Sequence, residues 1–278
     1  MTKIITQKYQ NFEVNIIPAL SNNYIYLLEC FRSGKTICID PGEFEAVDNF
    51  LTKQNLNLDF IIITHKHWDH VSGILKLKEK YNCKTIIFEN DREIISGGDV
   101  FLTINDAPRK TILSEENNFK LGKITFTPFT TFGHCQNHIS YFVKEENILF
   151  CGDTLFSSGC GRIFPDGSIE ELFDSLNNKI AKLPLNTQIY CSHEYTLNNI
   201  KFALTLEPNN QDLLLKHKNC QDLRRQDQPT LPTKLKNELK TNPFLRSYSE
   251  EIRKNIGTKK GLDDLEVFKT IRSLKDRF

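Results

Sequence analysis

A compact run of ligand-type side chains is the most chemically informative feature of this sequence. An apolar stretch at 60–64 predicts a buried strand, and imidazole and carboxylate groups follow it directly. Because side chains alternate along an extended chain, residues 65, 67 and 69 are expected on one side, and residue 70 joins them if the chain turns there. Such groups bind zinc, iron or manganese, so the run predicts a metal site. The four candidate ligands are His65, His67, Asp69 and His70.

Three further candidate ligands occupy similar positions later in the chain. His134, Asp153 and His193 each lie one or two residues beyond an apolar, strand-like segment. Strand ends at one edge of a sheet meet in space, so all seven groups are expected to gather in one cleft. Seven ligands exceed the needs of one four-coordinate ion but suit two ions that share a carboxylate. Two such ions lower the pKa of a water molecule between them and polarise a carbonyl or phosphoryl oxygen, which predicts a hydrolase.

Other residues near these ligands have less defined roles. His138 lies four residues after His134 and is expected to support the metal site or the core without binding an ion. His217 lies in a lysine-rich helical segment and is expected to be solvated. Trp68, inside the first ligand run, is expected to pack in the core or to wall the cleft.

The segments that must position these ligands change in character near residue 196. Before it, short runs rich in β-branched and aromatic residues predict strands, with helical patterns between them. After it, no strand pattern is present, and helical patterns punctuated by proline and glycine follow. We therefore expect a catalytic α/β domain over 1–196 and a helical domain over 197–278. The predicted strands are 12–18, 24–30, 36–39, 60–64, 84–89, 123–130, 139–143, 148–151 and 187–191, and the predicted helices are 43–53, 72–81, 168–182, 197–206, 210–226, 232–240, 247–256 and 262–275.

Composition and charge exclude several classes of protein. The 36 Lys and Arg residues balance 35 Asp and Glu residues, and a net charge of +1 argues against nucleic acid or an anionic membrane as a partner. The N-terminal segment lacks the apolar core of a secretion signal, and no apolar run is long enough to cross a membrane. The 8 cysteines are scattered and are expected to be reduced core residues. We expect a soluble, cytoplasmic and monomeric protein.

The motifs resemble those of a known family. Residues 64–70, Thr-His-Lys-His-Trp-Asp-His, resemble the signature of the metallo-β-lactamase superfamily. The run His193-Glu194-Tyr195-Thr196 and the C-terminal segments sharpen the resemblance to glyoxalase II, the hydroxyacylglutathione hydrolases. The resemblance covers the chain from about residue 13 to the end. The other matching segments are 18–24, 151–156, 159–162, 242–246 and 272–276.

This resemblance implies an αββα sandwich followed by a helical domain that helps to bind glutathione. The substrate would be S-D-lactoylglutathione, cleaved to D-lactate and glutathione in methylglyoxal detoxification. Asp69 and Asp153 would be the catalytic carboxylates, and a hydroxide bridging two divalent ions would be the nucleophile. The ions would be zinc, with iron or manganese also accepted by such ligands. One ion would be held by His65, His67 and His134 and the other by Asp69, His70 and His193, with Asp153 bridging, while Arg162, Tyr195, Arg272 and Lys275 would contact the glutathione part.

Three positions depart from the family's pattern. Lys66 stands where histidine is common, but its side chain alternates away from the ligands, so the metal site is expected to survive. Residues 132–138 differ from the usual Pro-Gly-His-Thr-x-Gly-His, although His134 keeps its place in the motif. Phe164 stands where tyrosine can occur, so one possible hydroxyl contact to the peptide part of the substrate is absent.

Two other functions fit parts of the sequence. A glutathione persulfide dioxygenase of the same superfamily would use one iron, two histidines and one aspartate, and would leave several of the seven ligands redundant. A nucleic-acid-processing or non-catalytic member would need a strongly basic surface, which the near-neutral charge does not favour. The full ligand set and the basic pair Arg272 and Lys275 favour the thioester hydrolase.

Overall fold

The computed structural model describes residues 2–103, 118–257 and 261–278, which form two compact units. The first unit comprises Met1–Thr130 and Asn137–Gly152, and the second comprises Thr131–Gln136 and Asp153–Phe278. The candidate ligands His65, His67, Asp69 and His70 belong to the first unit, whereas His134, Asp153 and His193 belong to the second. The domain boundary expected at residue 196 stays a prediction.

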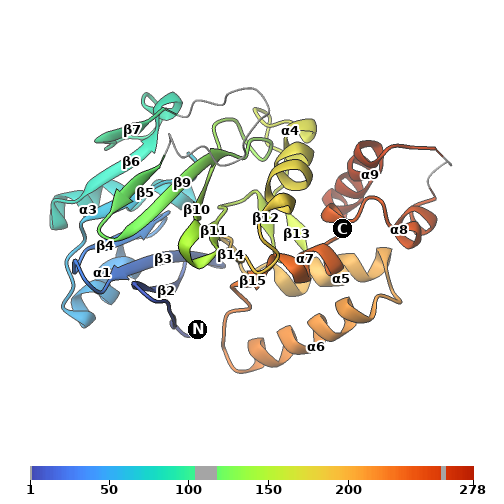
Figure 1. Ribbon diagram of the computed structural model, residues 1–278, viewed down its shortest axis with the longest axis horizontal. Helices are drawn as coiled ribbons and strands as arrows, with labels where there is room; N and C mark the ends of the chain where they lie inside the picture. The colour runs from blue at the N-terminus through green and yellow to red at the C-terminus, as the bar shows by residue number, and fades with distance from the viewer. Residues whose placement is uncertain (1, 104–117, 258–260) are drawn as a thin grey trace. The chain divides into compact units, whose positions relative to one another are not determined.

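A seven-stranded sheet in the order β1 to β7 forms one layer of the first unit (Figure 1). Neighbouring strands are antiparallel from β1 to β4 and parallel from β4 to β7. Parallel neighbours need a crossover, and α1 (Phe44–Gln54) joins β4 to β5 while α2 (Trp68–Val71) and α3 (Ile74–Tyr81) join β5 to β6. The strands are β1 (Ile5–Lys8), β2 (Phe12–Ala19), β3 (Asn23–Cys30), β4 (Thr36–Ile39), β5 (Phe60–Ile62), β6 (Lys84–Phe88) and β7 (Val100–Leu102).

An antiparallel sheet forms a second layer, with β8 (Phe119–Leu121), β9 (Ile124–Thr130), β10 (Ile139–Val143) and β11 (Ile148–Phe150) side by side. The Tyr141 hydroxyl on β10 donates to the carbonyl of Ile63 at 2.7 Å, which links this layer to the end of β5. On the other side of the seven-stranded sheet, α1 and α3 bury apolar side chains such as Val47 and Leu77 against the strands. The first unit is therefore helices on a sheet packed on a second sheet.

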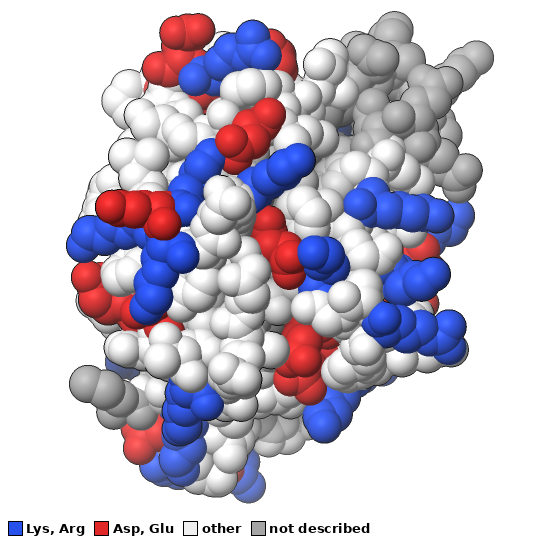
Figure 2. All heavy atoms as spheres, turned by 90° about the vertical axis from the view of Figure 1, so that its left-hand side faces the viewer, with Lys and Arg blue, Asp and Glu red and all other residues white. Residues whose placement is uncertain are grey.

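Opposite charges alternate over much of the face that carries α1 and α3 (Figure 2). Lys76 and Lys80 on α3 pair with Glu45 and Asp48 on α1, at 3.3 and 2.5 Å. Among the described residues, no helix is long and apolar enough to cross a lipid bilayer.

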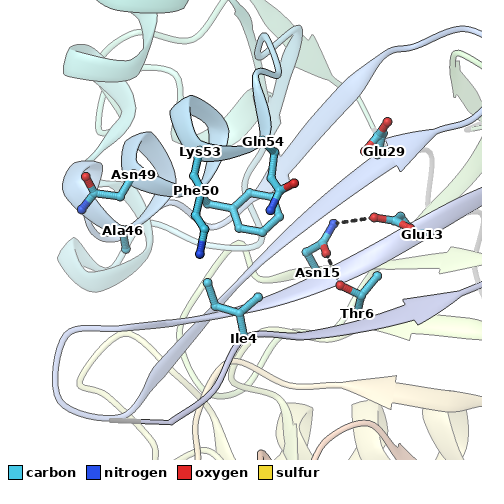
Figure 3. Close-up of a pocket in the computed structure, with 10 residues that line it drawn as sticks. All are labelled: Ile4, Thr6, Glu13, Asn15, Glu29, Ala46, Asn49, Phe50, Lys53 and Gln54. Carbon is cyan, nitrogen blue, oxygen red and sulfur yellow. Dashed lines mark hydrogen bonds between the residues drawn. The ribbon is translucent and has the colours of Figure 1, made fainter.

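Figure 3 shows a pocket of about 390 Å³ between α1 and the strands β1 to β3. Glu13 on β2 lies directly opposite Glu29 on β3, and burial together with this neighbouring charge raises the pKa of the Glu29 carboxyl group. The buried Asn15 amide donates to Glu13 at 3.4 Å and accepts from the Thr6 hydroxyl at 2.6 Å (Figure 3). None of the predicted site residues lines this pocket.

The second unit is mostly helical, and polar N-cap residues start four of its helices. The side chains of Ser168, Asn210, Ser249 and Asp263 each accept a hydrogen bond from the backbone N–H three residues on, which satisfies a donor that the helix leaves unpaired. Two short strand pairs, β12 with β13 and β14 with β15, complete this unit. Its elements are β12 (Leu155–Phe156), β13 (Gly159–Cys160), α4 (Ile169–Asp174), β14 (Gln188–Tyr190), α5 (Thr196–Leu206), α6 (Gln211–Arg225), β15 (Thr233–Lys234), α7 (Leu235–Thr241), α8 (Glu250–Asn255) and α9 (Asp264–Asp276).

Three expectations about local structure are wrong. A strand does occur after residue 196, because Thr233–Lys234 pairs with β14, so the helix expected from 232 begins at Leu235. The helix expected over 168–182 is α-helical only to Asp174 and continues as a π-helical turn and a 3₁₀ turn. The extended geometry expected through Asp69 ends at His67, since Asp69 lies in the first turn of α2.

Candidate metal centre

The four candidate ligands of the first unit converge where β5 leads into α2. The ring nitrogens His65 Nε2 and His67 Nδ1 are 3.0 Å apart, and the rings of His65 and His70 lie 4.0 Å apart between centroids. His70 Nε2 lies 3.7 Å from the Asp69 carboxylate. His65 and His70 are buried, whereas His67 and Asp69 are partly exposed, so the cluster lies at the boundary between the protein interior and solvent. This donor set fits a borderline divalent ion.

Asp40 fixes the orientation of one of these histidines. Its buried carboxylate accepts hydrogen bonds from the backbone N–H and the hydroxyl of Thr64, at 2.8 and 2.6 Å, and lies 3.0 Å from His70 Nδ1. A carboxylate can only accept, so His70 Nδ1 carries the proton and Nε2 presents its lone pair for an ion. Asp40 was not among the predicted site residues, although it directly follows β4, as the other candidates follow their strands.

Asp153 lies between two imidazoles in the second unit. One carboxylate oxygen is 3.6 Å from His134 Nε2 and the other is 3.3 Å from His193 Nε2. His134 Nδ1 lies 2.7 Å from the carbonyl of Arg162, and this acceptor places the proton on Nδ1 and the lone pair on Nε2. Each oxygen of this carboxylate therefore faces a different imidazole nitrogen, a geometry that suits a group shared by two ions.

Two residues predicted to contact substrate, Tyr195 and Arg162, lie in this region together with Phe164. The Tyr195 ring stacks on His193, with 4.7 Å between centroids and 2° between planes. The Arg162 guanidinium lies 4.6 Å from the centre of the Phe164 ring, and that ring stands edge-on to His134 at 5.1 Å. The apolar side chain at 164 thus contributes to orienting a ligand and a cation.

The two basic residues of α9 differ in their surroundings. Arg272 is 5% exposed and donates to the carbonyls of Cys160 and Gly161, at 3.2 and 3.4 Å, and to Asp276. Its guanidinium therefore anchors α9 to the loop that leads to Arg162. The buried ammonium of Lys275 has no hydrogen-bond partner among the described residues and lies 5.2 Å from the centre of the Phe202 ring. Burial and the charge of Arg272 lower the pKa of Lys275 to about 8.

The remaining residues of interest differ in their burial. The buried His138 ring stacks on the candidate ligand His65, with 4.7 Å between centroids. Trp68 is 66% exposed, so the expectation that it packs in the core is wrong. His217 lies on α6 and is half-buried. All 8 cysteines lie in the described residues, are buried and form no disulfide.

In the atypical segment 132–138, Asn137 takes a backbone conformation that few residue types tolerate. This residue has φ +66°, the left-handed conformation for which the family's pattern has glycine. Asparagine tolerates this conformation better than other residues, and the buried Asn137 amide also donates to Asp91 at 3.0 Å.

We predict that Asn137→Ala lowers the free energy of unfolding by about 2 kcal/mol, since it loses both the tolerated left-handed conformation and the hydrogen bond. Asn137→Gly should lose less, because glycine adopts the same conformation without strain. Urea unfolding monitored by circular dichroism measures both changes. Equal losses in the two variants would show that the backbone conformation is not what selects asparagine.

Comparisons with known proteins identify the family of this chain. The family model for the metallo-beta-lactamase superfamily matches residues 19–193, and the model for the hydroxyacylglutathione hydrolase C-terminus matches residues 194–278. The hydroxyacylglutathione hydrolase of Methylococcus capsulatus is 39% identical over 266 residues, which cover 96% of this chain and 98% of that protein. That of Marinomonas sp. is 38% identical over 267 residues, covering 94% and 98%.

Solved structures support the same fold. ETHE1 from Myxococcus xanthus has a TM-score of 0.62 at 22% identity, over 96% of this chain and 98% of that one. The BLEG-1 B3 metallo-beta-lactamase has a TM-score of 0.59 at 23% identity, over 83% and 98%. The predicted fold class, a metallo-β-lactamase-like αββα sandwich followed by a helical C-terminal region, is confirmed.

Proposed function

Because this chain belongs to the hydroxyacylglutathione hydrolase family of the metallo-β-lactamase superfamily, we propose that it hydrolyses S-D-lactoylglutathione to D-lactate and glutathione. This reaction would place it in methylglyoxal detoxification. The observation that carries the proposal is identity of 36–39% to hydroxyacylglutathione hydrolases along nearly the whole chain, including the C-terminal family segment.

We propose that the seven ligands hold two divalent ions, zinc or else iron or manganese. The position of Asp153 between His134 and His193 supports its role as the bridging group. Ions held there would lower the pKa of a water molecule and polarise the thioester carbonyl. The proposed ligands of one ion are His65, His67 and His134, those of the other are Asp69, His70 and His193, and Asp153 is shared.

The chain's own residues would prepare and hold the reactants. Asp40 and the Arg162 carbonyl keep the protons of His70 and His134 on Nδ1, so that both Nε2 atoms stay available. We propose that Lys275 and Arg162 attract the glutathione carboxylates, while Tyr195 and Arg272 shape their binding site. This anionic handle lies away from the reacting bond and orients the thioester. The leaving thiolate has a pKa of about 8.5, like that of free cysteine, and needs no protein acid.

We further propose that the chain acts as a monomer in the cytoplasm, without nucleic acid or membrane. The balanced charge of +1 supports only the absence of a nucleic-acid or anionic-membrane partner.

Product analysis separates the proposed function from its alternative. The metal-loaded protein should release equal amounts of D-lactate and free thiol from S-D-lactoylglutathione, with no change in dissolved oxygen. Oxygen uptake with glutathione persulfide, in the absence of thioester cleavage, would instead identify a dioxygenase.

The surroundings of Lys275 predict a pH dependence. Its lowered pKa of about 8 means that its charge is lost between pH 7 and 9, and with it the attraction for the substrate carboxylates. We expect kcat/KM for S-D-lactoylglutathione to fall above pH 8 with an apparent pKa of about 8, mainly through KM.

Steady-state kinetics between pH 6.5 and 9.5 test this expectation with a matched pair of variants. In Lys275→Met, kcat/KM should not change with pH and should equal the value that the unmodified protein has at high pH. Lys269→Met, on the same helix, removes a lysine whose pKa is raised by Glu170 and Glu266 and should leave the profile unchanged. If kcat/KM still falls above pH 8 in Lys275→Met, the fall is caused by the titration of another group.

A further inference from the structure

The turn between β2 and β3 places the buried amide of Asn23 next to the candidate ligand Asp69. Ala19 pairs with Asn23 across the two strands, so only three residues form the turn. Leu20, the first of them, has φ +50°, a conformation that bulky side chains rarely adopt. Its N–H donates to Glu43 at 3.1 Å, which holds the strained residue in place. Backbone strain that the surrounding structure maintains is typical of segments that position a functional group.

Asn23 is the residue that this turn places, and it is only 6% exposed. Its Nδ2 lies 3.0 Å from Asp69 Oδ2 and 3.3 Å from the backbone oxygen of Asp69. The carboxylate oxygen and the backbone oxygen of Asp69 can only accept, which fixes the orientation of the Asn23 amide group. Both N–H groups of the amide donate to this one residue. Because Asn23 is buried, water cannot readily replace it.

The backbone of Asp69 is held from a second side. A Cβ at Gly42 would lie 1.8 Å from the carbonyl oxygen of Asp69, so glycine is required there for the close approach of the two chains. With its backbone fixed, Asp69 still has the rotations of its own side chain. The hydrogen bond from Asn23 restricts them and keeps Oδ2 on the side of His70 Nε2, 3.7 Å away.

We infer that Asn23 is a positioning residue for Asp69. It holds the carboxylate in place, so that the Asp69 side chain loses less conformational entropy when the ion proposed to bind Asp69 and His70 is bound. This inference rests on the proposed metal-ligand role of Asp69, and nothing in the ligand motif itself points to Asn23. The sequence separation of 46 residues is closed only by the fold.

Metal affinity measured on the metal-free protein tests this role without an activity assay. We propose titrating each variant with zinc in competition with a chromogenic chelator, while following the fluorescence of Trp68, the single tryptophan and the neighbour of Asp69. Asn23→Ala should weaken one of the two zinc affinities about 10- to 100-fold and leave the other within about twofold. Asn23→Leu, which fills the space but cannot donate, should behave alike if the alanine variant does not fold.

Asn22→Ala is the matched control, because Asn22 is the preceding residue of the turn and donates to Ser21. It should keep both affinities within about twofold. Unchanged affinities in Asn23→Leu, or equal weakening in Asn22→Ala, would overturn the inference. Asp69→Ala separates failure of the proposed ligand role from failure of the positioning role. If Asp69→Ala keeps both zinc ions, the ligand role is wrong. If Asp69→Ala loses one ion while the Asn23 variants keep both zinc affinities, only the positioning role is wrong.

Discussion

An Asp153→Asn variant is expected to lose about three orders of magnitude in kcat/KM for S-D-lactoylglutathione, equivalent to about 4 kcal/mol of transition-state stabilisation. The two oxygens of Asp153 lie 3.6 and 3.3 Å from the Nε2 atoms of His134 and His193. An amide keeps the size of the side chain but removes the negative charge and one of the two good ligand oxygens. The variant should therefore bind fewer than two ions per chain.

Metal content after dialysis, measured beside the kinetics, gives the independent readout. Asp174→Asn on α4 is the control, since the Asp174 side chain is 49% exposed and its ion pair with Lys179 is long at 3.8 Å. It should keep both ions and full activity. An Asp153→Asn protein that retains two ions and normal turnover would contradict the bridging role.

Removal of the Glu238 side chain is expected to cause the largest loss of stability, about 3–5 kcal/mol in Glu238→Ala. This fully buried carboxylate on α7 lies within the second unit and ties several of its segments together. Its ion pair with Lys216 of α6 is itself largely buried, so the variant leaves a cation without its counter-charge. The other donors to Glu238 are the hydroxyl of Ser157, the backbone N–H of Ser158, the hydroxyl of Thr233 and the amide of Asn242.

Urea unfolding of the metal-loaded protein measures this loss. Glu238→Gln should also be destabilised, because it keeps the shape but not the charge that Lys216 faces. Glu250→Ala, at the exposed start of α8, should change the free energy of unfolding by less than about 1 kcal/mol. A Glu238→Ala protein as stable as the Glu250→Ala protein would show that the network contributes little.

The candidate ligands were predictable from sequence because each follows an apolar strand directly. His65, His67, Asp153 and His193 are placed by local rules: a strand must end before its polar groups can turn toward a site. The pairing of these ligands with the residues that orient them follows no such rule, even though Asp40 itself directly follows a strand. Asn23 reaches Asp69 across 46 residues and Asp40 reaches His70 across 30, so only the tertiary fold brings them together.

The same distinction holds for the secondary structure. Longer elements with clear periodicity, such as β2, β3, α5 and α6, were predicted within a few residues. The two-residue strand β15 was missed because its pairing with β14 is set by the chain that follows and not by its own composition. The π-helical turn after α4 was missed because it depends on how that helix packs and not on residue type.

The most direct test of the account is the rate of thiol release from S-D-lactoylglutathione as zinc is added back to the chelated protein. We predict negligible hydrolysis without zinc, a rise with added ion and a plateau at about two ions per chain. A metal-loaded protein that leaves the thioester intact, or a chelated protein that cleaves it at the full rate, would contradict the central claim.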